Sequence, residues 1–242
     1  MLNINNLEKF IKQAQTNTEN VIREYCQHLF LSNLYQRRGS EKLLFKGGTA
    51  LQMVFHSPRF SEDLDFTGAN ITSREIEAIF TDTLASIEQT GIPVDLVESK
   101  NTTGGHLGIA VFNVYDKKIL IQIEISLRHN RNIRGVRVLI ENDYVPAYTL
   151  VHLPMKELIL GKTQALLSRH KPRDFYDYFF LLSGNYPVVK DRKNLELVLK
   201  SLRKSKINFR AELKKFLPAS HSLHLKDFKR ILEKKILNFL GD

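Results

Sequence analysis

A strictly alternating segment, KILIQIEISL at residues 118–127, constrains the fold of this chain more than any other feature of its sequence. Successive side chains of a β-strand point to opposite faces of the sheet, so alternate residues share a face. One face of this predicted strand consists of isoleucine side chains: Ile119, Ile121, Ile123 and Ile125. Because such an apolar face must be covered, we expect helices to pack on it, while Glu124 points to the opposite face. The preceding segment, residues 106–115, predicts the other strand of a hairpin.

The order of predicted helices and strands along the rest of the chain indicates an α+β fold. Apolar residues recur at helical spacing over residues 5–36, 49–56 and 71–90, the last with Thr72 or Ser73 as its N-terminal cap. Further strands are predicted at residues 42–46, 59–68 and 93–99, and from about Pro154 onward the pattern is helical. The sequence therefore predicts two domains: residues 1–150 with a mixed or antiparallel sheet, and residues 151–242 with helices alone.

Composition excludes several classes of protein. The single cysteine, Cys26, cannot form an internal disulfide or a cysteine-rich zinc site, and a reducing cytoplasm is its simplest location. The eight histidines show no metal-ligand spacing. No apolar run approaches the ~18–20 residues of a membrane-spanning helix, and the polar first residues do not resemble a secretory signal. We therefore expect a cytoplasmic protein without a membrane partner.

The positive charge of the chain is concentrated near its C-terminal end. The formal net charge is +10, and residues 190–242 hold 15 basic and 6 acidic side chains, against 21 and 20 in residues 1–189. A basic segment of this kind attracts nucleic acid through steering and counterion release. Charge alone is equally compatible with a solvated, lysine-rich helix surface.

Two aspartates at alternate positions, Asp63 and Asp65 in RFSEDLDF, form the most informative chemical motif. On a strand both carboxylates would project from one face, about 6–7 Å apart. Two negative charges this close favour a bound cation or a shared proton, and Mg²⁺, with Mn²⁺ as the alternative, prefers such oxygen ligands. Glu124 is the candidate for a third metal-binding carboxylate. The alternatives are a surface pair of aspartates and an exposed strand glutamate.

Two glycines precede this motif in KGGTAL, residues 46–51. Glycines after a strand let backbone N–H groups approach a phosphate, and the start of a helix adds positive potential there. A purely structural turn is the alternative for this segment. Combined with the paired aspartates, the turn indicates a site for phosphoryl transfer.

A second informative segment lies at residues 154–181. Its Gly-Lys-Thr at 161–163 is not a P-loop, because Lys156 stands where the motif requires glycine and the segment is helical. Lys162 and Arg169 share one side of that helix, where they would direct cations toward a triphosphate or form a charged rim. Asp174 and Asp177 open the next helix, where acidic residues suit the helix dipole. The aromatic residues at 175–180 are expected in the core.

Taken in order, KGGTAL, RFSEDLDF and GKTQALLSRHKPRDFYDYFFL resemble the abortive-infection toxin nucleotidyltransferases of the AbiEii/AbiGii type. The resemblance spans residues ~40–182 and implies a minimal DNA polymerase β-like nucleotidyltransferase core, with helices on one face of the sheet, before the helical domain. It implies that Asp63 and Asp65 hold Mg²⁺ and that the acid at Asp174 is essential. The nucleotide-binding positions expected on this basis are Lys46, Gly47, Gly48, Thr49, Ser61, Lys162 and Arg169.

The resulting functional hypothesis is a Mg²⁺-dependent nucleotidyltransferase toxin. It would transfer a nucleotide from an NTP to an acceptor hydroxyl and release pyrophosphate, with tRNA as the expected acceptor on the basic C-terminal helices. Because several family members belong to toxin–antitoxin pairs, a cognate antitoxin is an expected partner. Two alternatives stay open: nucleotidylation of a protein hydroxyl, including the enzyme's own, and a non-catalytic RNA- or antitoxin-binding module that retains the fold.

Overall fold

The computed structural model describes residues 4–127, 133–184 and 186–241, which divide into two compact units. Unit 1 comprises Met1–His56 and Phe60–Pro154, and unit 2 comprises Ser57–Arg59 and Met155–Asp242. Each unit is described by itself. The segment Ser57–Arg59 therefore packs with the helical unit, although in the sequence it lies between two elements of the sheet unit.

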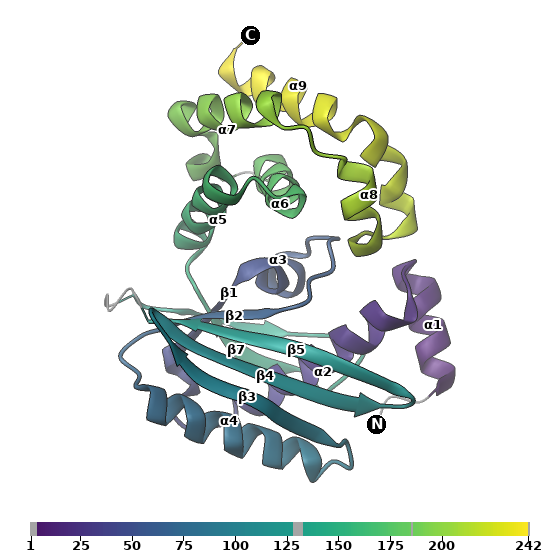
Figure 1. Cartoon of the computed structure of the whole chain (residues 1–242), viewed down its shortest axis with the longest axis vertical. Helices are drawn as coiled ribbons and strands as arrows, with labels where there is room; N and C mark the ends of the chain where they lie inside the picture. The colour runs from purple at the N-terminus through teal and green to yellow at the C-terminus, as the bar shows by residue number, and fades with distance from the viewer. Residues whose placement is uncertain (1–3, 128–132, 185, 242) are drawn as a thin grey trace. The chain divides into compact units, whose positions relative to one another are not determined.

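A mixed sheet forms the centre of unit 1 (Figure 1). Its seven described strands run in the order β3-β4-β5-β2-β1-β7-β6, with the β2–β5 and β1–β7 pairs parallel and the others antiparallel. The strands are β1 (Leu43–Lys46), β2 (Leu64–Gly68), β3 (Val94–Thr102), β4 (Gly105–Val114), β5 (Lys117–Ser126), β6 (Val136–Ile140) and β7 (Tyr148–His152). The helices are α1 (Ile4–Ala14), α2 (Thr18–Leu34), α3 (Gly47–Phe55) and α4 (Ser73–Glu88). The predicted α+β fold is confirmed.

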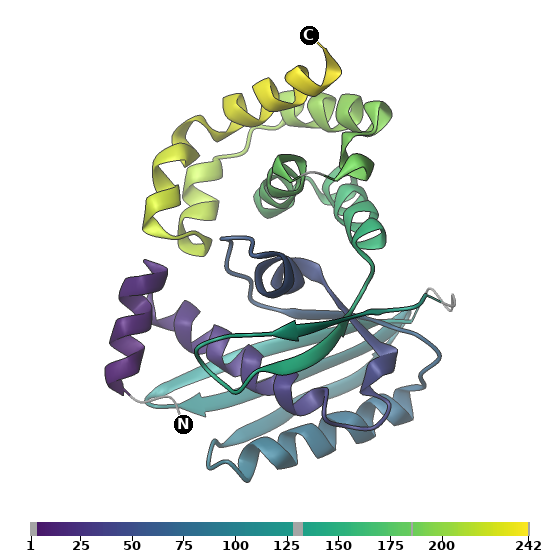
Figure 2. The ribbon, with the colours of Figure 1, turned by 180° about the vertical axis from the view of Figure 1, so that it is seen from behind.

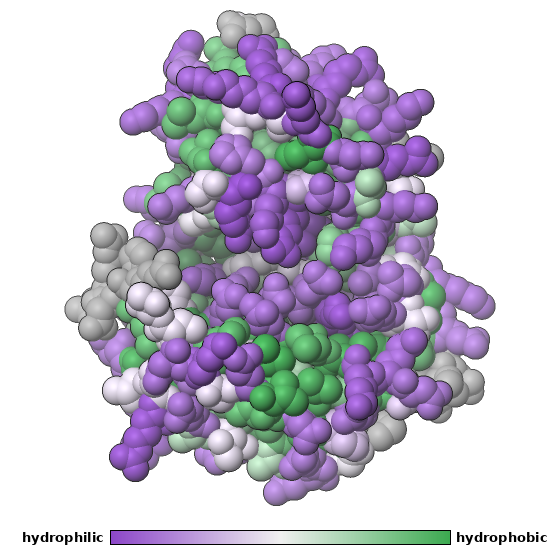
Figure 3. Space-filling view, viewed as in Figure 1, coloured by the Kyte–Doolittle hydropathy of each residue, from purple (hydrophilic) through white to green (hydrophobic). Residues whose placement is uncertain are grey.

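The alternating segment forms β5 and behaves as predicted. Its four isoleucines are buried, and the α2 and α4 helices cover this face of the sheet (Figures 1 and 2). Phe30 of α2 and Phe80 of α4 meet edge to face there, with ring centroids 5.9 Å apart. The opposite face is open over β3–β5, where Val97 is 60 % and Leu120 51 % exposed, and Figure 3 shows apolar side chains gathered over these strands. This open face also carries Glu124.

The N-terminal helical segment differs from the prediction, because it consists of two helices rather than one. The chain leaves α1 at Gln15, which has a φ of +49°, and α2 begins after Asn17. The Asn17 side chain accepts a hydrogen bond from the Asn20 N–H and so caps α2. By contrast, α4 starts as predicted, with Thr72 as its N-cap and a capping box completed by Glu75.

The predicted strands at residues 93–99, 106–115 and 118–127 are confirmed as β3, β4 and β5, and the last two form the expected hairpin. The strands β6 and β7 were not predicted, because they are short and β6 is half exposed without strict alternation. The Tyr35 hydroxyl donates hydrogen bonds to the carbonyls of Leu43 and Val151, so it connects the end of α2 to β1 and β7.

The strand predicted over residues 59–68 is wrong in its first half, since β2 begins only at Leu64. Arg59 is buried, pairs with Asp177 and belongs to the helical unit rather than to the sheet unit. Asp63 lies just before the strand. The alternation predicted that both aspartates lie on one face of the same strand, but in the structure only Asp65 belongs to a strand.

Unit 2 consists of helices in its described part: α5 (Met155–Arg169), α6 (Pro172–Ser183), α7 (Arg192–Lys204), α8 (Phe209–Leu213) and α9 (Phe228–Leu240), with short 3₁₀ turns between them. Aromatic rings form its core, as predicted for residues 175–180: Phe175 packs edge to face on Phe209, and Tyr176 stacks on Phe228. None of the described helices is long and apolar enough to cross a membrane.

Candidate active site

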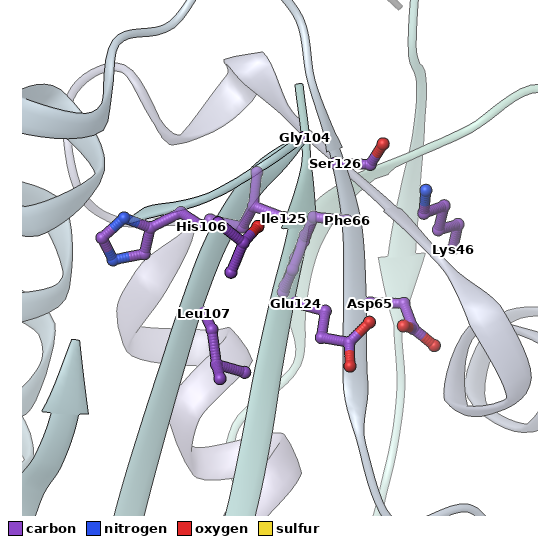
Figure 4. A pocket seen from close by; sticks show the side chains of 10 residues that line it. Lys46, Asp65, Phe66, Gly104, His106, Leu107, Glu124, Ile125 and Ser126 are labelled. Carbon is purple, nitrogen blue, oxygen red and sulfur yellow. The ribbon is translucent and has the colours of Figure 1, made fainter. Parts of the chain in front are cut away.

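Three charged side chains lie in one row across the centre of the sheet of unit 1. The strand register places Lys46 of β1 opposite Asp65 of β2, and Asp65 opposite Glu124 of β5. Register partners on neighbouring strands, which are about 4.8 Å apart, project from the same face. Figure 4 shows the carboxylates of Asp65 and Glu124 side by side. Strand pairing thus brings together two of the predicted metal-binding carboxylates and a predicted nucleotide-binding lysine.

The row lines a cavity of about 290 Å³ in unit 1. Its walls also include Thr102, Leu107 and Ser126, so polar and apolar groups meet there. His106 borders the cavity, but its ring points away from the carboxylates (Figure 4) and bonds to the side chains of Ser99 and Asn101. Because burial lowers the pKa of His106, this ring is neutral at physiological pH and serves the sheet rather than the charged row.

Gly47 has to be a glycine for two reasons. It has a φ of +85°, a backbone conformation that side chains disfavour, and a Cβ at this position would collide with the Asp65 carboxylate. The glycine turn therefore lies directly against one of the candidate metal ligands. As the first residues of α3, Gly47 and Gly48 also place the start of that helix beside the charged row.

The position of Thr49 differs from the one expected for a residue that contacts a phosphate. It is fully buried, and its hydroxyl donates a hydrogen bond to the carbonyl of Asp63. Ser61, another predicted nucleotide-binding residue, has its N–H bonded to the side-chain oxygen of Gln52. Both residues therefore help to fix the chain around Asp63, and their binding of nucleotide stays a prediction.

A buried ion cluster lies in unit 2 and contains the predicted phosphate-binding lysine. The Arg59 guanidinium binds both carboxylate oxygens of Asp177, at 2.7 and 3.0 Å, and Lys162 Nζ lies 2.7 Å from Asp177 Oδ2. Asp177 and Arg59 are 1 % and 3 % exposed. Burial alone would raise the pKa of Asp177, but the two cations outweigh it and lower this pKa to about 2. Asp177 is therefore a carboxylate at every physiological pH.

The predicted essential acid, Asp174, occupies a similar but separate position one helical turn earlier. It is 1 % exposed, and both of its oxygens accept hydrogen bonds from Arg169, the closest at 2.6 Å. Arg169, predicted to bind nucleotide, is thus engaged with Asp174 while its side chain stays about half exposed. Arg169 and Asp174 form one ion pair, so a functional role of either residue has to be tested together with that of its partner.

Sequence reasoning missed several residues that hold these sites. Arg59 was unassigned, and Asp177 was assigned only to the helix dipole, although its spacing of three from Asp174 places both on neighbouring positions of one helix face. Gln27 and Gln52, which contact the chain before Asp63, carry no recognisable motif. Their roles depend on contacts between segments far apart in the sequence, which the sequence pattern does not report.

The acidic residues of unit 1 suit a magnesium ion that is shared with a substrate. In the described parts of the chain, no three histidine, cysteine or acidic side chains already form a metal-binding cluster. Mg²⁺ is commonly bound by one or two carboxylates, with waters and substrate phosphates completing its shell. The paired Asp65 and Glu124 fit such a partial ligand set, and metal binding by the half-buried Asp63, which precedes the strand, stays a prediction.

Comparison with solved structures agrees with the fold. The structure is similar to the crystal structure of JHP933 from Helicobacter pylori (TM-score 0.57, 18 % identity, 94 % of this chain and 100 % of that chain covered). It is also similar to a candidate nucleotidyltransferase from H. pylori (TM-score 0.55, 20 % identity, 92 % and 98 % covered). At these identities the likeness shows a shared fold. No curated protein matches the sequence significantly.

A family model provides the assignment that the solved structures do not. The model described as nucleotidyl transferase AbiEii toxin, type IV toxin–antitoxin system, matches residues 29–241. This range contains the glycine turn, the charged row, the buried cluster around Asp177 and the Arg169–Asp174 pair. The chain therefore belongs to the AbiEii family of nucleotidyltransferase toxins.

Proposed function

We propose that this protein transfers a nucleotide from an NTP to an RNA acceptor, with tRNA as the expected substrate, in a reaction that depends on Mg²⁺. The observation that carries the proposal is the register pairing of Asp65 with Glu124 on neighbouring strands, beside Lys46 and the Gly47 turn. Uniting two carboxylates, a cation and a helix start on one sheet face serves the binding of a metal-complexed triphosphate.

Each group has a separate task in the proposed reaction. The Lys46 ammonium and the N–H groups at the start of α3 bind the phosphates and orient the α-phosphorus for in-line attack. Asp63, Asp65 and Glu124 would hold Mg²⁺, which neutralises the negative charge that develops on the phosphates. Glu124 or Asp65 accepts the proton of the attacking hydroxyl. The new bond joins the acceptor oxygen to the α-phosphorus, and pyrophosphate leaves.

Lys162 is also proposed to contact phosphates. Its ammonium carries three donors, and the structure gives one of them to Asp177. The Asp177 carboxylate therefore positions the Lys162 ammonium without accepting all three of its N–H donors. The proposed roles of Asp174 and Arg169, as an essential acid and a nucleotide contact, compete with their own ion pair.

A basic cavity of about 410 Å³ in unit 2 supports RNA as the acceptor. Lys206, Arg210 and Lys226 line it and form no ion pair with described residues. Lys229 also lines it and donates hydrogen bonds to the carbonyls of Arg203 and Ser205. Uncompensated cations around one hollow attract the phosphates of a polynucleotide.

Label transfer tests the proposal directly. The protein is incubated with each labelled NTP, total tRNA and Mg²⁺, and we expect label in tRNA with at least one NTP and none with Asp63→Ala. Absence of transfer with every NTP, or transfer unaffected by Asp63→Ala, would refute the proposal. Intact mass after exposure to NTP separates RNA from protein acceptors, because only protein nucleotidylation adds mass to a polypeptide.

We also propose a cognate antitoxin, because the family description places its members in toxin–antitoxin systems. Expression of the wild-type chain alone should then arrest growth, and Asp65→Asn should not. Equal growth arrest by both proteins would indicate a non-catalytic module instead. Co-expression with a gene adjacent to the toxin gene should restore growth if that gene encodes the antitoxin.

A further inference from the structure

The segment that carries Asp63 lies outside the sheet, and side chains hold its backbone in place of a neighbouring strand. The strand pairing of β2 begins at Leu64, so residues 61–63 have no ladder partner. Four main-chain groups of this segment nevertheless bond to side chains of α2 and α3. Because buried main-chain groups need partners, these side chains decide which path the chain follows before β2.

Gln27 of α2 holds two of the four groups. Its Nε2 donates to the carbonyls of Ser61 and Glu62, at 3.0 and 3.1 Å. Gln27 is 1 % exposed, so water does not replace these bonds. One amide group therefore bridges two consecutive carbonyls immediately before Asp63.

Two residues of α3 hold the other two groups. Thr49 donates to the carbonyl of Asp63, and Gln52 Oε1 accepts from the Ser61 N–H at 3.2 Å. The amide of Gln52 is oriented by Glu24 of α2, whose Oε1 accepts from Gln52 Nε2 at 3.0 Å. A flipped amide would turn two donors toward each other at Ser61. The orientation of Gln52 is thus fixed from the side opposite the segment.

We propose that Gln27 and Gln52 are positioning residues, which act through the backbone of residues 61–63 to present the Asp63 carboxylate to a divalent metal. This inference rests on the proposed function, in which Asp63 is a metal ligand. The two glutamines contact the residues leading to Asp63, where neither a helix nor a strand supplies order. Gln52 lies on the same helix as the Gly47 turn, so one helix sets both the glycine turn and the position of this carboxylate.

Two variants and a matched control test this role. Gln27→Met keeps the length of the side chain but removes its donor, and Gln52→Leu removes the acceptor at a half-buried position. Gln36→Met makes the same replacement two residues after the end of α2, where the side-chain amide donates to the Ser32 carbonyl of that helix and not to residues 61–63. Titration with Mn²⁺ followed by electron paramagnetic resonance gives metal affinity without requiring activity.

We expect Gln27→Met and Gln52→Leu to weaken Mn²⁺ binding about tenfold, a typical cost of removing groups that orient metal ligands. The Mg²⁺ concentration for half-maximal transfer should rise about tenfold as well, while the rate at saturating Mg²⁺ stays within about threefold. Hydrogen exchange of the amides at residues 61–64 should accelerate in both variants. Gln36→Met should match the wild type in all three measurements.

Metal affinity equal to the wild type in both variants would overturn the positioning role, even if the protein were less stable. A fall in saturating rate without a change in metal response would also overturn it. If the wild type neither binds Mn²⁺ nor transfers nucleotide, the proposed function fails. The exchange measurement then decides separately whether these glutamines hold the segment, because unchanged exchange at residues 61–64 refutes it.

Discussion

Two acidic residues, Asp177 in unit 2 and Glu24 in unit 1, have opposite electrostatic surroundings. In unit 2, Asp177 is buried between Arg59 and Lys162, which lower its pKa to about 2. In unit 1, Glu24 is enclosed with neutral donors only, and burial raises its pKa to about 7 although bonds from Tyr144 and Gln52 lower it. The surroundings of Asp177 stabilise its ionised form, whereas those of Glu24 favour its protonated, neutral form.

This difference separates carboxylates that hold the structure from those that are able to bind something else. A buried aspartate whose oxygens are occupied by cations, as in Asp177 and Asp174, has little capacity left for a ligand. The exposed Glu124, which accepts a hydrogen bond from Gln122, lies beside Asp65 on an open sheet face. We therefore expect substitution of Asp65 or Glu124 to affect activity, and substitution of Asp177 to affect stability.

The largest effect is expected from Asp65→Asn. Loss of this carboxylate should lower nucleotide transfer about 10³-fold or more, corresponding to about 4 kcal/mol of transition-state stabilisation. The free energy of unfolding should change by less than about 1 kcal/mol, because the replacement preserves shape. Transfer to tRNA and urea unfolding measure the two quantities. Asp116→Asn, in the exposed turn between β4 and β5, is the control and should change neither.

The converse is expected for Asp177→Asn. Removing the charge leaves Arg59 and Lys162 without their anion, and breaking a buried pair of this kind costs about 3–5 kcal/mol. Urea unfolding followed by circular dichroism of the helices gives this loss. Glu196→Gln is the matched control, since its exposed pair with Arg192 contributes about 0–1 kcal/mol. A stable Asp177→Asn protein without activity would break the comparison and make Asp177 a functional acid.

A smaller effect distinguishes the two kinds of buried carboxylate by pH. Glu24 has a folded pKa of about 7 against an ordinary value of 4.5, so the folded state keeps the proton where the unfolded state loses it. The free energy of unfolding should therefore fall as pH rises from 4.5 to about 7, by about 1–3 kcal/mol at 1.36 kcal/mol per pKa unit. Glu24→Gln should remove this fall, and Glu19→Gln, exposed on the same helix, should retain it. A fall that persists in Glu24→Gln would assign the titration elsewhere.

For Asp177 the free energy of unfolding changes with pH in the opposite direction. Its folded pKa of about 2 lies below the ordinary value of 3.8. The charged Asp177 therefore stabilises the fold above pH 3.8, and this stabilisation is lost as the pH falls from 3.8 to about 2. Unfolding of the wild type between these values should include this loss, and Asp177→Asn should lack it. If Glu24→Gln and Asp177→Asn remove changes of opposite sign in the free energy of unfolding with pH, the electrostatic contrast between the units is confirmed.

Local sequence patterns predicted five of the strands, the hairpin and the face of the sheet on which Glu124 lies. Alternation fixed which face of β5 is buried, and so it placed Glu124 on the open face before any partner strand was known. The pairing of Glu124 with Asp65 then followed from the order of strands, which no local pattern contains. The glycine turn was also visible, but its collision with Asp65 depends on how α3 follows β1.

The same patterns failed where distant segments decide the conformation. Alternation over residues 59–68 predicted a strand, yet Arg59 pairs with Asp177, Gln27 binds the carbonyls of Ser61 and Glu62, and the strand begins only at Leu64. Periodicity over residues 5–36 likewise missed the break at Asn17, because apolar spacing continues across it. A buried ion pair or a buried side-chain amide stabilises the observed backbone conformation more than the intrinsic propensity of these segments favours a regular strand or helix.

The smallest effect concerns the basic cavity of unit 2, whose cations lack the anions that Arg59 and Lys162 have. Replacing Lys206, Arg210 and Lys226 by alanine should reduce the slope of log affinity for tRNA against log salt by about 2–3, at roughly 0.7–0.9 per phosphate contact. The NTP concentration for half-maximal transfer should not change, because these residues line a cavity separate from the charged row. A triple replacement of the exposed Lys193, Lys200 and Lys234, which lie outside the cavity, controls for net charge and should change the slope less. Equal slopes for both triple variants would mean that tRNA responds to the charge of the unit as a whole, whereas a joint loss of NTP affinity would assign the cavity to the nucleotide.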